Sequence, residues 1–240
     1  MRVLTLEHLM AAADRGVRVR LLVDDMFLST GGAFDGADQA LAAVDYHPGI
    51  ELRLFNPGNY RSGILGLSGN FGLDLKTYNR RMHNKAWIAD NRVAIVGGRN
   101  IGDEYLSEGR WRDTDVYVSG PGVAGIQHVF LRIWDKIATL ERKAGCPSAD
   151  DYGLYCPDDV LLLEDPAYYP EMLPEGPAIT RAIHSDPFSQ ETPMGYFLTL
   201  ALVRSARESI TIANSYFVPP NRLRKHLKAA AARGVKVTVL

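Results

Sequence analysis

The chain has 240 residues, of which 46% are hydrophobic and 23% are charged, a composition typical of a globular protein with one large domain or two smaller ones. Its formal net charge of −1 creates no overall field that would draw it onto nucleic acid or an anionic membrane, so any affinity for phosphate has to be local. The sequence contains no run of 18 apolar residues and therefore predicts no transmembrane helix.

The first third of the chain alternates between helical and strand patterns. Residues 1–15 carry apolar side chains at helical spacing, and residues 17–24 predict a strand that is buried on both faces because apolar residues follow one another. A short helix is expected at 39–44 and a strand at 50–55. The glycine-rich segment 56–76 predicts a loop, whose apolar side chains either face an apolar part of a ligand or fold onto one another.

The middle of the chain predicts a hairpin and a long helix. Strands are expected at 85–89 and 92–96, separated by a tight turn at Asp90 and Asn91, and a third strand at 115–118. A proline opens the helix expected at 121–142. The segment 143–190 is rich in Pro, Asp and Gly and looks like a connection between lobes, and the next helix is expected at 191–206.

One internal repeat is present. Residues 8–19 and 226–237 share the pattern His-Leu-x-Ala-Ala-Ala-x-Arg-Gly-Val-x-Val, at an offset of 226 − 8 = 218. Each copy predicts a helix that ends at a left-handed glycine and is followed by a strand. The repeat therefore predicts a duplicated α/β lobe. A second copy of residue 83 would fall near 83 + 218 = 301, so we expect the chain to be the interior of a longer, two-lobed protein.

The groups that could carry chemistry are concentrated between residues 83 and 100. His83, Lys85 and Asp90 form H-x-K-x4-D, and Gly97 to Asn100 form G-G-x-N. An imidazole can attack phosphorus, and ammonium and amide groups can hold phosphoryl oxygens. A lone histidine or an edge lysine is usually structural, but their common spacing on a predicted strand would place both side chains on one face.

This pattern resembles the signature of the phospholipase D superfamily, H-x-K-x4-D-x6-G-[SG]-x-N. The blocks Arg-Met-His-Asn-Lys and Gly-Gly-Arg-Asn-Ile-Gly-Asp-Glu-Tyr are most similar to bacterial cardiolipin synthases. The resemblance implies an α/β fold in which a mixed sheet is flanked by helices. It also implies a first lobe at 1–142 that lacks its first strand, an inter-lobe connection at 143–190, and a second lobe that begins at 191–240 and stops before its own motif.

The resemblance also implies roles for individual residues. His83 would be the nucleophile and form a phosphohistidine, while Lys85 and Asn100 would stabilise the phosphoryl oxygens. Asp113 would accept a hydrogen bond from the imidazole, with Asp115 on the same strand face as the runner-up.

Four further residues of the motif are assigned less directly. Asp90 is included with the catalytic residues, although an Asx turn that supports the backbone is the preferred role. Gly97, Gly98 and Arg99 are expected to bind substrate, and the two glycines to let the backbone turn so that Asn100 reaches the site.

The function implied by the resemblance is transfer of a phosphatidyl group from one phospholipid to the hydroxyl of another, as in cardiolipin synthesis. No metal or cofactor is expected, because basic side chains and amides handle the phosphate. Phospholipid, a membrane surface and a second motif-bearing lobe of the same full-length chain are the expected partners, and nucleic acid is not. The expected location is peripheral, on the cytoplasmic side of a bacterial inner membrane.

Two alternatives remain open at this point. A phosphodiesterase of the same superfamily that acts on nucleic acid would predict a wider basic groove and stacking aromatic side chains. A catalytically incomplete fragment or an inactive scaffold is the other alternative, because in the family the leaving group takes its proton from the histidine of the second motif.

Overall fold

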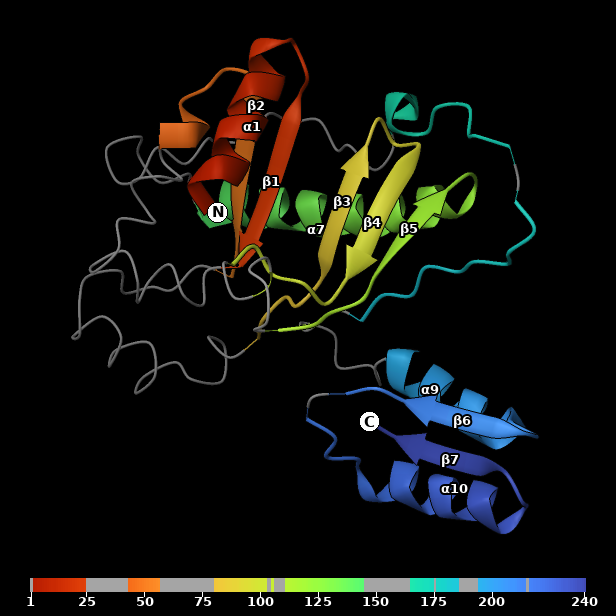
Figure 1. The fold of residues 1–240 in the computed structure, drawn as a ribbon. Helices are drawn as coiled ribbons and strands as arrows, with labels where there is room; N and C mark the ends of the chain where they lie inside the picture. Colours follow the sequence, from red (N-terminus) through yellow and green to blue (C-terminus); the bar gives the residue numbers. More distant parts are fainter. Residues whose placement is uncertain are drawn as a thin grey trace, which may run out of the picture. The chain divides into compact units, whose positions relative to one another are not determined.

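The structure, a computed structural model of the chain, describes residues 2–24, 43–56, 80–102, 105, 111–144, 165–174, 176–185, 194–214 and 216–240. They form a mixed α/β protein in which sheets are flanked by helices (Figure 1), so the expected fold class is confirmed. The chain divides into two compact units, Met1–Ala182 and Ile183–Leu240.

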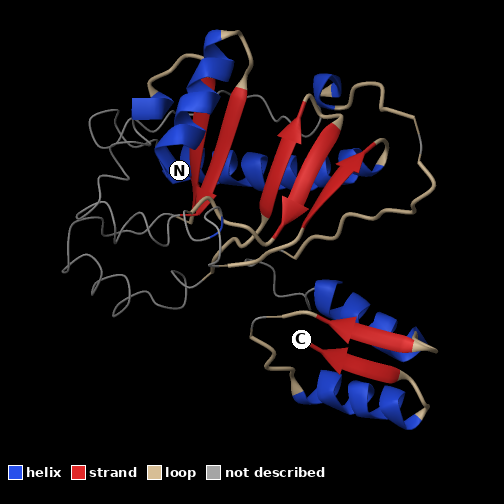
Figure 2. Cartoon of the chain, viewed as in Figure 1, coloured by secondary structure: helices blue, strands red, loops and turns tan. Residues whose placement is uncertain are grey.

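The first unit opens with a parallel pair of strands that is covered on both faces. Helix α1 (Arg2–Asp14) precedes β1 (Val19–Asp24), which pairs in parallel with β2 (Ile50–Phe55). On one face Val19 and Ile50 form a buried cluster with Ala13 of α1. On the other face Leu22 packs against the long helix α7 (Gly122–Ala144). Figure 2 shows a helix on each side of this pair, as expected for parallel strands.

A three-stranded antiparallel sheet follows, in the order β3-β4-β5. Its strands are β3 (Lys85–Ala89), β4 (Val93–Gly97) and β5 (Asp115–Ser119). Between β3 and β4, Asp90 and Asn91 have φ angles of 52° and 55°, and Arg92 donates its N–H to the carbonyl of Ala89 at 3.0 Å. Positive angles at both central residues are those of a type I′ turn, which Asp and Asn tolerate better than most residues, and the register pairs Ala89 with Val93 beyond it.

Helix α7 is the common support of both sheets, since it contacts β2, β3, β4 and β5. Leu131 and Trp134 are fully buried in it. The buried Arg53 of β2 donates to the carbonyl of Trp134 at 2.9 Å, and its guanidinium lies 4.3 Å from the centroid of the Trp134 ring. Hydrogen bonding and cation–π attraction thus stabilise a charge that would otherwise be costly to bury.

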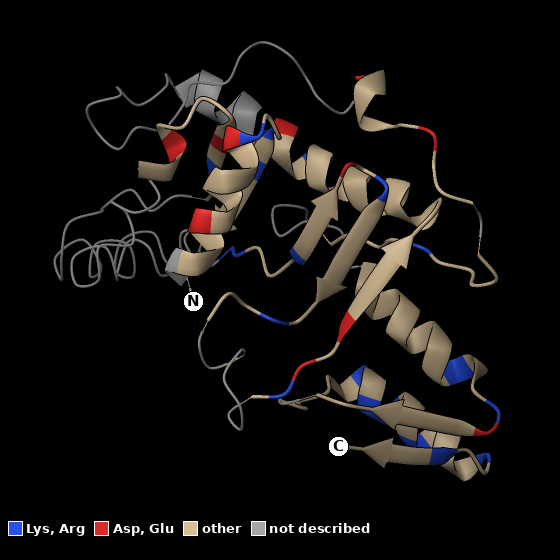
Figure 3. Ribbon diagram, turned by 45° about the horizontal axis from the view of Figure 1, so that its top comes forward, with Lys and Arg blue, Asp and Glu red and all other residues tan. Residues whose placement is uncertain are grey.

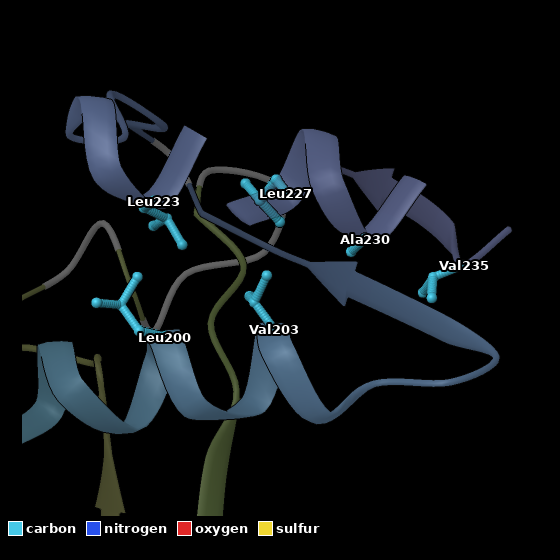
Figure 4. Close-up of a cluster of buried hydrophobic side chains, with 6 residues drawn as sticks. All are labelled: Leu200, Val203, Leu223, Leu227, Ala230 and Val235. Atoms are coloured by element: carbon cyan, nitrogen blue, oxygen red, sulfur yellow. The ribbon is translucent and has the colours of Figure 1, made fainter. Parts of the chain in front are cut away.

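The second unit consists of α9 (Met194–Ser205), β6 (Ser209–Ile212), α10 (Asn221–Ala232) and β7 (Lys236–Val239). Strands β6 and β7 are parallel. The core lies where the two helices meet (Figure 4), and it contains Leu200, Val203, Leu223, Leu227, Ala230 and Val235. None of the described helices in either unit combines the length and apolar character needed to cross a bilayer.

The two copies of the sequence repeat have the same local structure. Gly16 and Gly234 have φ angles of 87° and 90°, the left-handed conformation expected after a helix. Val17 donates to Ala12 at 3.2 Å, and Val235 donates to Ala230 at 3.2 Å. A strand of a parallel pair follows each glycine. That both copies belong to a duplicated lobe remains a prediction, as do the boundaries 1–142, 143–190 and 191–240.

Some expectations fall outside the described residues. They include the apolar side chains of the loop at 57–79, residues 39–42 of the short helix, and residues 145–164 and 186–190 of the predicted inter-lobe connection.

The left-handed glycine predicts a stability effect. Gly16→Ala places a Cβ in open space, so only the backbone conformation is penalised, and we expect the free energy of unfolding to fall by about 1–2 kcal/mol. All three tryptophans lie in the first unit, so urea unfolding followed by tryptophan fluorescence measures the change. Gly176→Ala is the control because Gly176 has an ordinary φ and equally open surroundings. Equal effects of the two substitutions would contradict the assigned role of Gly16.

Candidate functional site

The site residues gather at one edge of the first unit, the lower edge in Figure 1. Strands β1, β2 and β4 end at this edge, while β3 and β5 begin there. The motif therefore lies where a parallel pair and an antiparallel sheet meet. In α/β proteins the carboxyl ends of parallel strands are the usual place for ligand-binding groups.

Four hydrogen bonds attach the segment just before His83 to the ends of β1 and β2. Asp24, the last residue of β1, accepts from the backbone N–H of Met82 at 2.8 Å and from Nη1 of Arg81 at 3.2 Å. Arg81 also donates from Nη2 to the carbonyl of Asn56 at 2.8 Å, and the Asn56 amide donates to the carbonyl of Arg80 at 2.9 Å. The Asp24 and Arg81 side chains are only 18% and 12% exposed, so solvent weakens this ion pair less than a surface pair.

His83 is exposed to solvent and lies two residues ahead of β3. A shared strand face is therefore not what relates it to Lys85. Instead, Nζ of Lys85 donates to the backbone carbonyl of His83 at 3.0 Å. Within the described parts of the chain, no hydrogen bond to the His83 ring is found, so the ring is open to a substrate.

Burial and neighbouring charges favour the neutral imidazole. Partial burial lowers the pKa of His83 below 6.5, the ammonium of Lys85 lowers it further, and the carboxylate of Asp24 opposes both. Burial also lowers the pKa of Lys85, against the opposing charges of Asp113 and Asp24. A neutral ring nitrogen beside a cationic amine is the combination needed for attack on an anionic phosphodiester.

The predicted acidic partners of His83 are held by other groups. Asp115 accepts from Nε of Arg99 at 2.7 Å. Oδ1 of Asp113 accepts from the backbone N–H of Thr114 at 2.8 Å, and the charge of Asp113 acts on Lys85 rather than on the imidazole. The carboxylate that acts on His83 is Asp24, and the pairing of Asp113 with the ring remains a prediction.

Gly97 and Gly98 provide space for two neighbouring carboxylates. Neither has a positive φ. A Cβ on Gly97 would lie 1.9 Å from Oδ1 of Asp115, and one on Gly98 would lie 2.8 Å from Oδ2 of Asp113. The two glycines thus let two carboxylates lie against the end of β4, which a larger residue would prevent.

The partly exposed side chain of Arg99 links the ends of β4 and β5. Besides its bond to Asp115, it donates from Nη1 to the carbonyl of Tyr105 at 2.7 Å and from Nη2 to the carbonyl of Asp113 at 3.1 Å. The hydrogen bond to Asp115 is the main cause that raises the pKa of Arg99. All three guanidinium nitrogens therefore have protein partners, which gives Arg99 an organising role, and its expected contact with substrate remains a prediction.

Asn100 and Asp90 are the remaining members of the motif. The exposed Asn100 donates from its amide to the hydroxyl of Tyr105 at 3.2 Å. Asp90 forms the type I′ turn at the opposite end of β3, about 16 Å along the strand from Lys85. The structure thus brings His83, Lys85, Gly97, Gly98 and Asp113 to one edge and leaves Asp90 at the other end of the hairpin.

Asp24 is the residue of this site that sequence reasoning missed. The available signal was an acid directly after the apolar run Leu21 to Val23 of a predicted parallel strand, a position that belongs to the ligand-binding edge in such folds. Its contact with Met82 spans 58 positions, so no local pattern connected it with His83.

The charges around His83 predict opposite changes in its pKa. Lys85→Gln removes a positive charge and should raise the pKa of His83, whereas Asp24→Asn removes a negative charge and should lower it. The pKa is measured by NMR titration of the ring protons, which are assigned with His83→Gln. Arg92→Gln, at the far end of the hairpin, is the control and should leave the pKa unchanged. A His83 pKa that responds to neither neighbour would contradict the described arrangement.

Comparison with protein families identifies the same region. The family described as "Cardiolipin synthase, PLD-like domain" matches residues 2–134, more than half of the chain, and this match includes every predicted site residue.

Comparison with curated proteins extends the similarity along the chain. Cardiolipin synthase C of Escherichia coli (strain K12) is 35% identical over 257 aligned positions, covering 97% of this chain and 52% of that protein. The cardiolipin synthase of Geobacillus kaustophilus (strain HTA426) is 31% identical over 97% of this chain and 40% of its own length. The probable cardiolipin synthase YwiE of Bacillus subtilis (strain 168) is 28% identical over 98% and 40%, respectively.

These relatives are much longer than the sequence that matches them, and the chain spans about half of their length or less. The expected resemblance is confirmed: the chain belongs to the phospholipase D-like domain family of cardiolipin synthases.

Proposed function

We propose that this chain supplies one half of the catalytic site of a phosphatidyltransferase that makes cardiolipin from phospholipids. The observation that carries the proposal is the environment of His83, a solvent-accessible imidazole whose pKa is lowered beside the Lys85 ammonium. Membership of the family and the names of the relatives support the lipid substrate.

The proposed reaction has two displacements at phosphorus. In the first, a neutral ring nitrogen of His83 attacks the phosphodiester of one phospholipid, a P–N bond forms, and the P–O bond to the head-group alcohol breaks. In the second, the hydroxyl of another lipid attacks the phosphohistidine, a new P–O bond forms, the P–N bond breaks to release His83, and the hydroxyl proton passes to the histidine of the second half-site. Each displacement develops charge on the phosphoryl oxygens, which fixed donors stabilise.

Lys85 suits the role of such a donor. An ammonium has three N–H donors, and among the described residues one of them is used, by the carbonyl of His83. The other two can reach phosphoryl oxygens while the first keeps the amine beside the nucleophile. We assign Asp24 a positioning role, since it holds the N–H of Met82 immediately before His83, and we retain Asn100 as a second donor and Asp113 as the acceptor for the ring.

A second half-site completes the proposal. The head-group alcohol leaves as an alkoxide unless it is protonated, and we propose that the histidine of a second H-x-K-x4-D lobe in the same full-length chain supplies this proton. The repeat at 226–237 and the greater length of the relatives support this proposal. We further propose that the full-length protein works at the cytoplasmic surface of a bacterial inner membrane as a peripheral enzyme.

Substitution of the nucleophile tests the proposal directly. The full-length protein is incubated with phosphatidylglycerol vesicles, and we expect cardiolipin as the product and no phosphoenzyme or turnover with His83→Gln. His128→Gln makes the same chemical change at an exposed position of α7 and should keep full activity. Continued turnover by His83→Gln would remove His83 from the mechanism, and cleavage of DNA without formation of cardiolipin would favour the nuclease alternative.

The pH dependence of the reaction provides a second test. The imidazole must be neutral to attack, and its pKa lies below 6.5, so the acidic limb of kcat/KM should have its midpoint below pH 6.5. Because Asp24 raises this pKa, Asp24→Asn should move the acidic limb of the profile to still lower pH. An acidic limb above 6.5 in the unsubstituted enzyme would contradict the proposed state of His83.

A further inference from the structure

The second unit carries a strong local excess of positive charge that the whole chain does not. Its described residues from 194 onward include one acid, Glu208, and eight basic residues, namely Arg204, Arg207, Arg222, Arg224, Lys225, Lys228, Arg233 and Lys236. Helix α10 alone carries four of these and no acid, and Figure 3 marks the Lys and Arg positions on the ribbon in blue. A charge of this density attracts anions over about one Debye length, roughly 8–10 Å at physiological salt.

A pocket of about 350 Å³ lies between α9 and α10 in this unit. Its walls combine two kinds of side chain. Apolar side chains come from α9, including Met194, Phe197 and Leu198, and cationic or imidazole groups come from Arg204, Arg222 and His226. In the part of this unit that the structure describes, no carboxylate lines the pocket or pairs with Arg204 or Arg222.

The apolar side of the pocket is open to water. Met194 and Phe197 are 54% and 46% exposed, and Leu202 on the same helix is 69% exposed, although Leu200 and Val203 of α9 are already buried in the core. Helix α9 is thus apolar on its outer side as well as on its inner side. Such a helix is expected to have an apolar environment on both sides.

We infer that this pocket and the surrounding cationic surface of α10 bind an anionic phospholipid bilayer. Arg204 and Arg222 would hold one lipid phosphate through charge-assisted hydrogen bonds, and Phe197 and Met194 would enter the layer of the upper acyl chains. A free anion would match the arginines but not the exposed apolar wall. Nucleic acid would match the charge, but it would leave Met194 and Leu198 against a polar backbone.

This inference goes beyond the proposed reaction. The pocket lies in the second unit and His83 lies in the first, so binding at the pocket is measured without turnover. Where the proposed function names a lipid as substrate, the inference names the side chains through which the chain meets the membrane surface.

The test measures co-sedimentation of the chain with vesicles of phosphatidylcholine, with and without phosphatidylglycerol, at low and at physiological salt. We expect binding only when phosphatidylglycerol is present. The double substitution Arg204→Gln/Arg222→Gln should weaken it by about tenfold or more.

Two matched controls separate the pocket from general charge and general hydrophobicity. Arg224→Gln/Lys228→Gln removes the same charge from the side of α10 opposite Arg222 and should weaken binding much less. Phe197→Gln should weaken binding more than Leu202→Gln, which removes an exposed leucine outside the pocket. Thermal unfolding of each variant confirms that the unit remains folded.

Three results would overturn the inference. They are equal losses of vesicle binding with the two double substitutions, displacement of the chain from vesicles by millimolar inorganic phosphate, and binding to duplex DNA that is tighter than binding to vesicles and requires Arg204 and Arg222. His83→Gln should bind vesicles as the unsubstituted chain does, so loss of catalysis and loss of membrane binding are told apart.

Discussion

The carboxylate of Asp24 is the contact on which the geometry of the candidate site depends. It lies at the carboxyl end of a buried parallel strand and holds both the backbone N–H of Met82 and the guanidinium of Arg81. Through these bonds the parallel pair and the antiparallel sheet share one edge, and the chain enters β3 with His83 exposed. Because both partners are largely buried, removing either one would leave a charge poorly solvated, which makes the junction specific as well as stable.

Two cationic side chains at this edge, Arg99 and Lys85, have different surroundings. Arg99 binds Asp115 and the carbonyls of Tyr105 and Asp113, and it therefore organises the ends of β4 and β5. Lys85 lies nearer the imidazole and keeps donors available. Because Gly97 and Gly98 have no side chains, the carboxylates of Asp113 and Asp115 can lie against the end of β4, near Lys85 and Arg99. Cationic and acidic side chains therefore lie side by side at this edge.

Local sequence patterns predicted the elements well because the forces that form them are local. The Asp-Asn pair at 90 and 91 predicted the hairpin turn, and the Arg-Gly-Val segments predicted two helix ends with the same left-handed glycine. The motif also located the edge where His83 and Lys85 meet. The roles of Asp24 and Arg99 escaped prediction because they depend on contacts between segments: Asp24 meets residues 57 and 58 positions away, and Arg99 acts through β5. The sequence also did not show why positions 97 and 98 are glycines, because a tight turn and close packing against neighbouring side chains both require glycine.

The place of Asp90 in the turn has a consequence for how the family is recognised. Five residues of β3 separate this aspartate from the reacting edge, and its left-handed backbone is a requirement that asparagine or glycine also satisfies. The signature H-x-K-x4-D is thus a composite, in which two letters lie at the proposed reacting edge and one lies at the chain reversal. A search that scores all three letters equally will overlook distant members whose hairpin reverses on a different residue while their chemistry is intact.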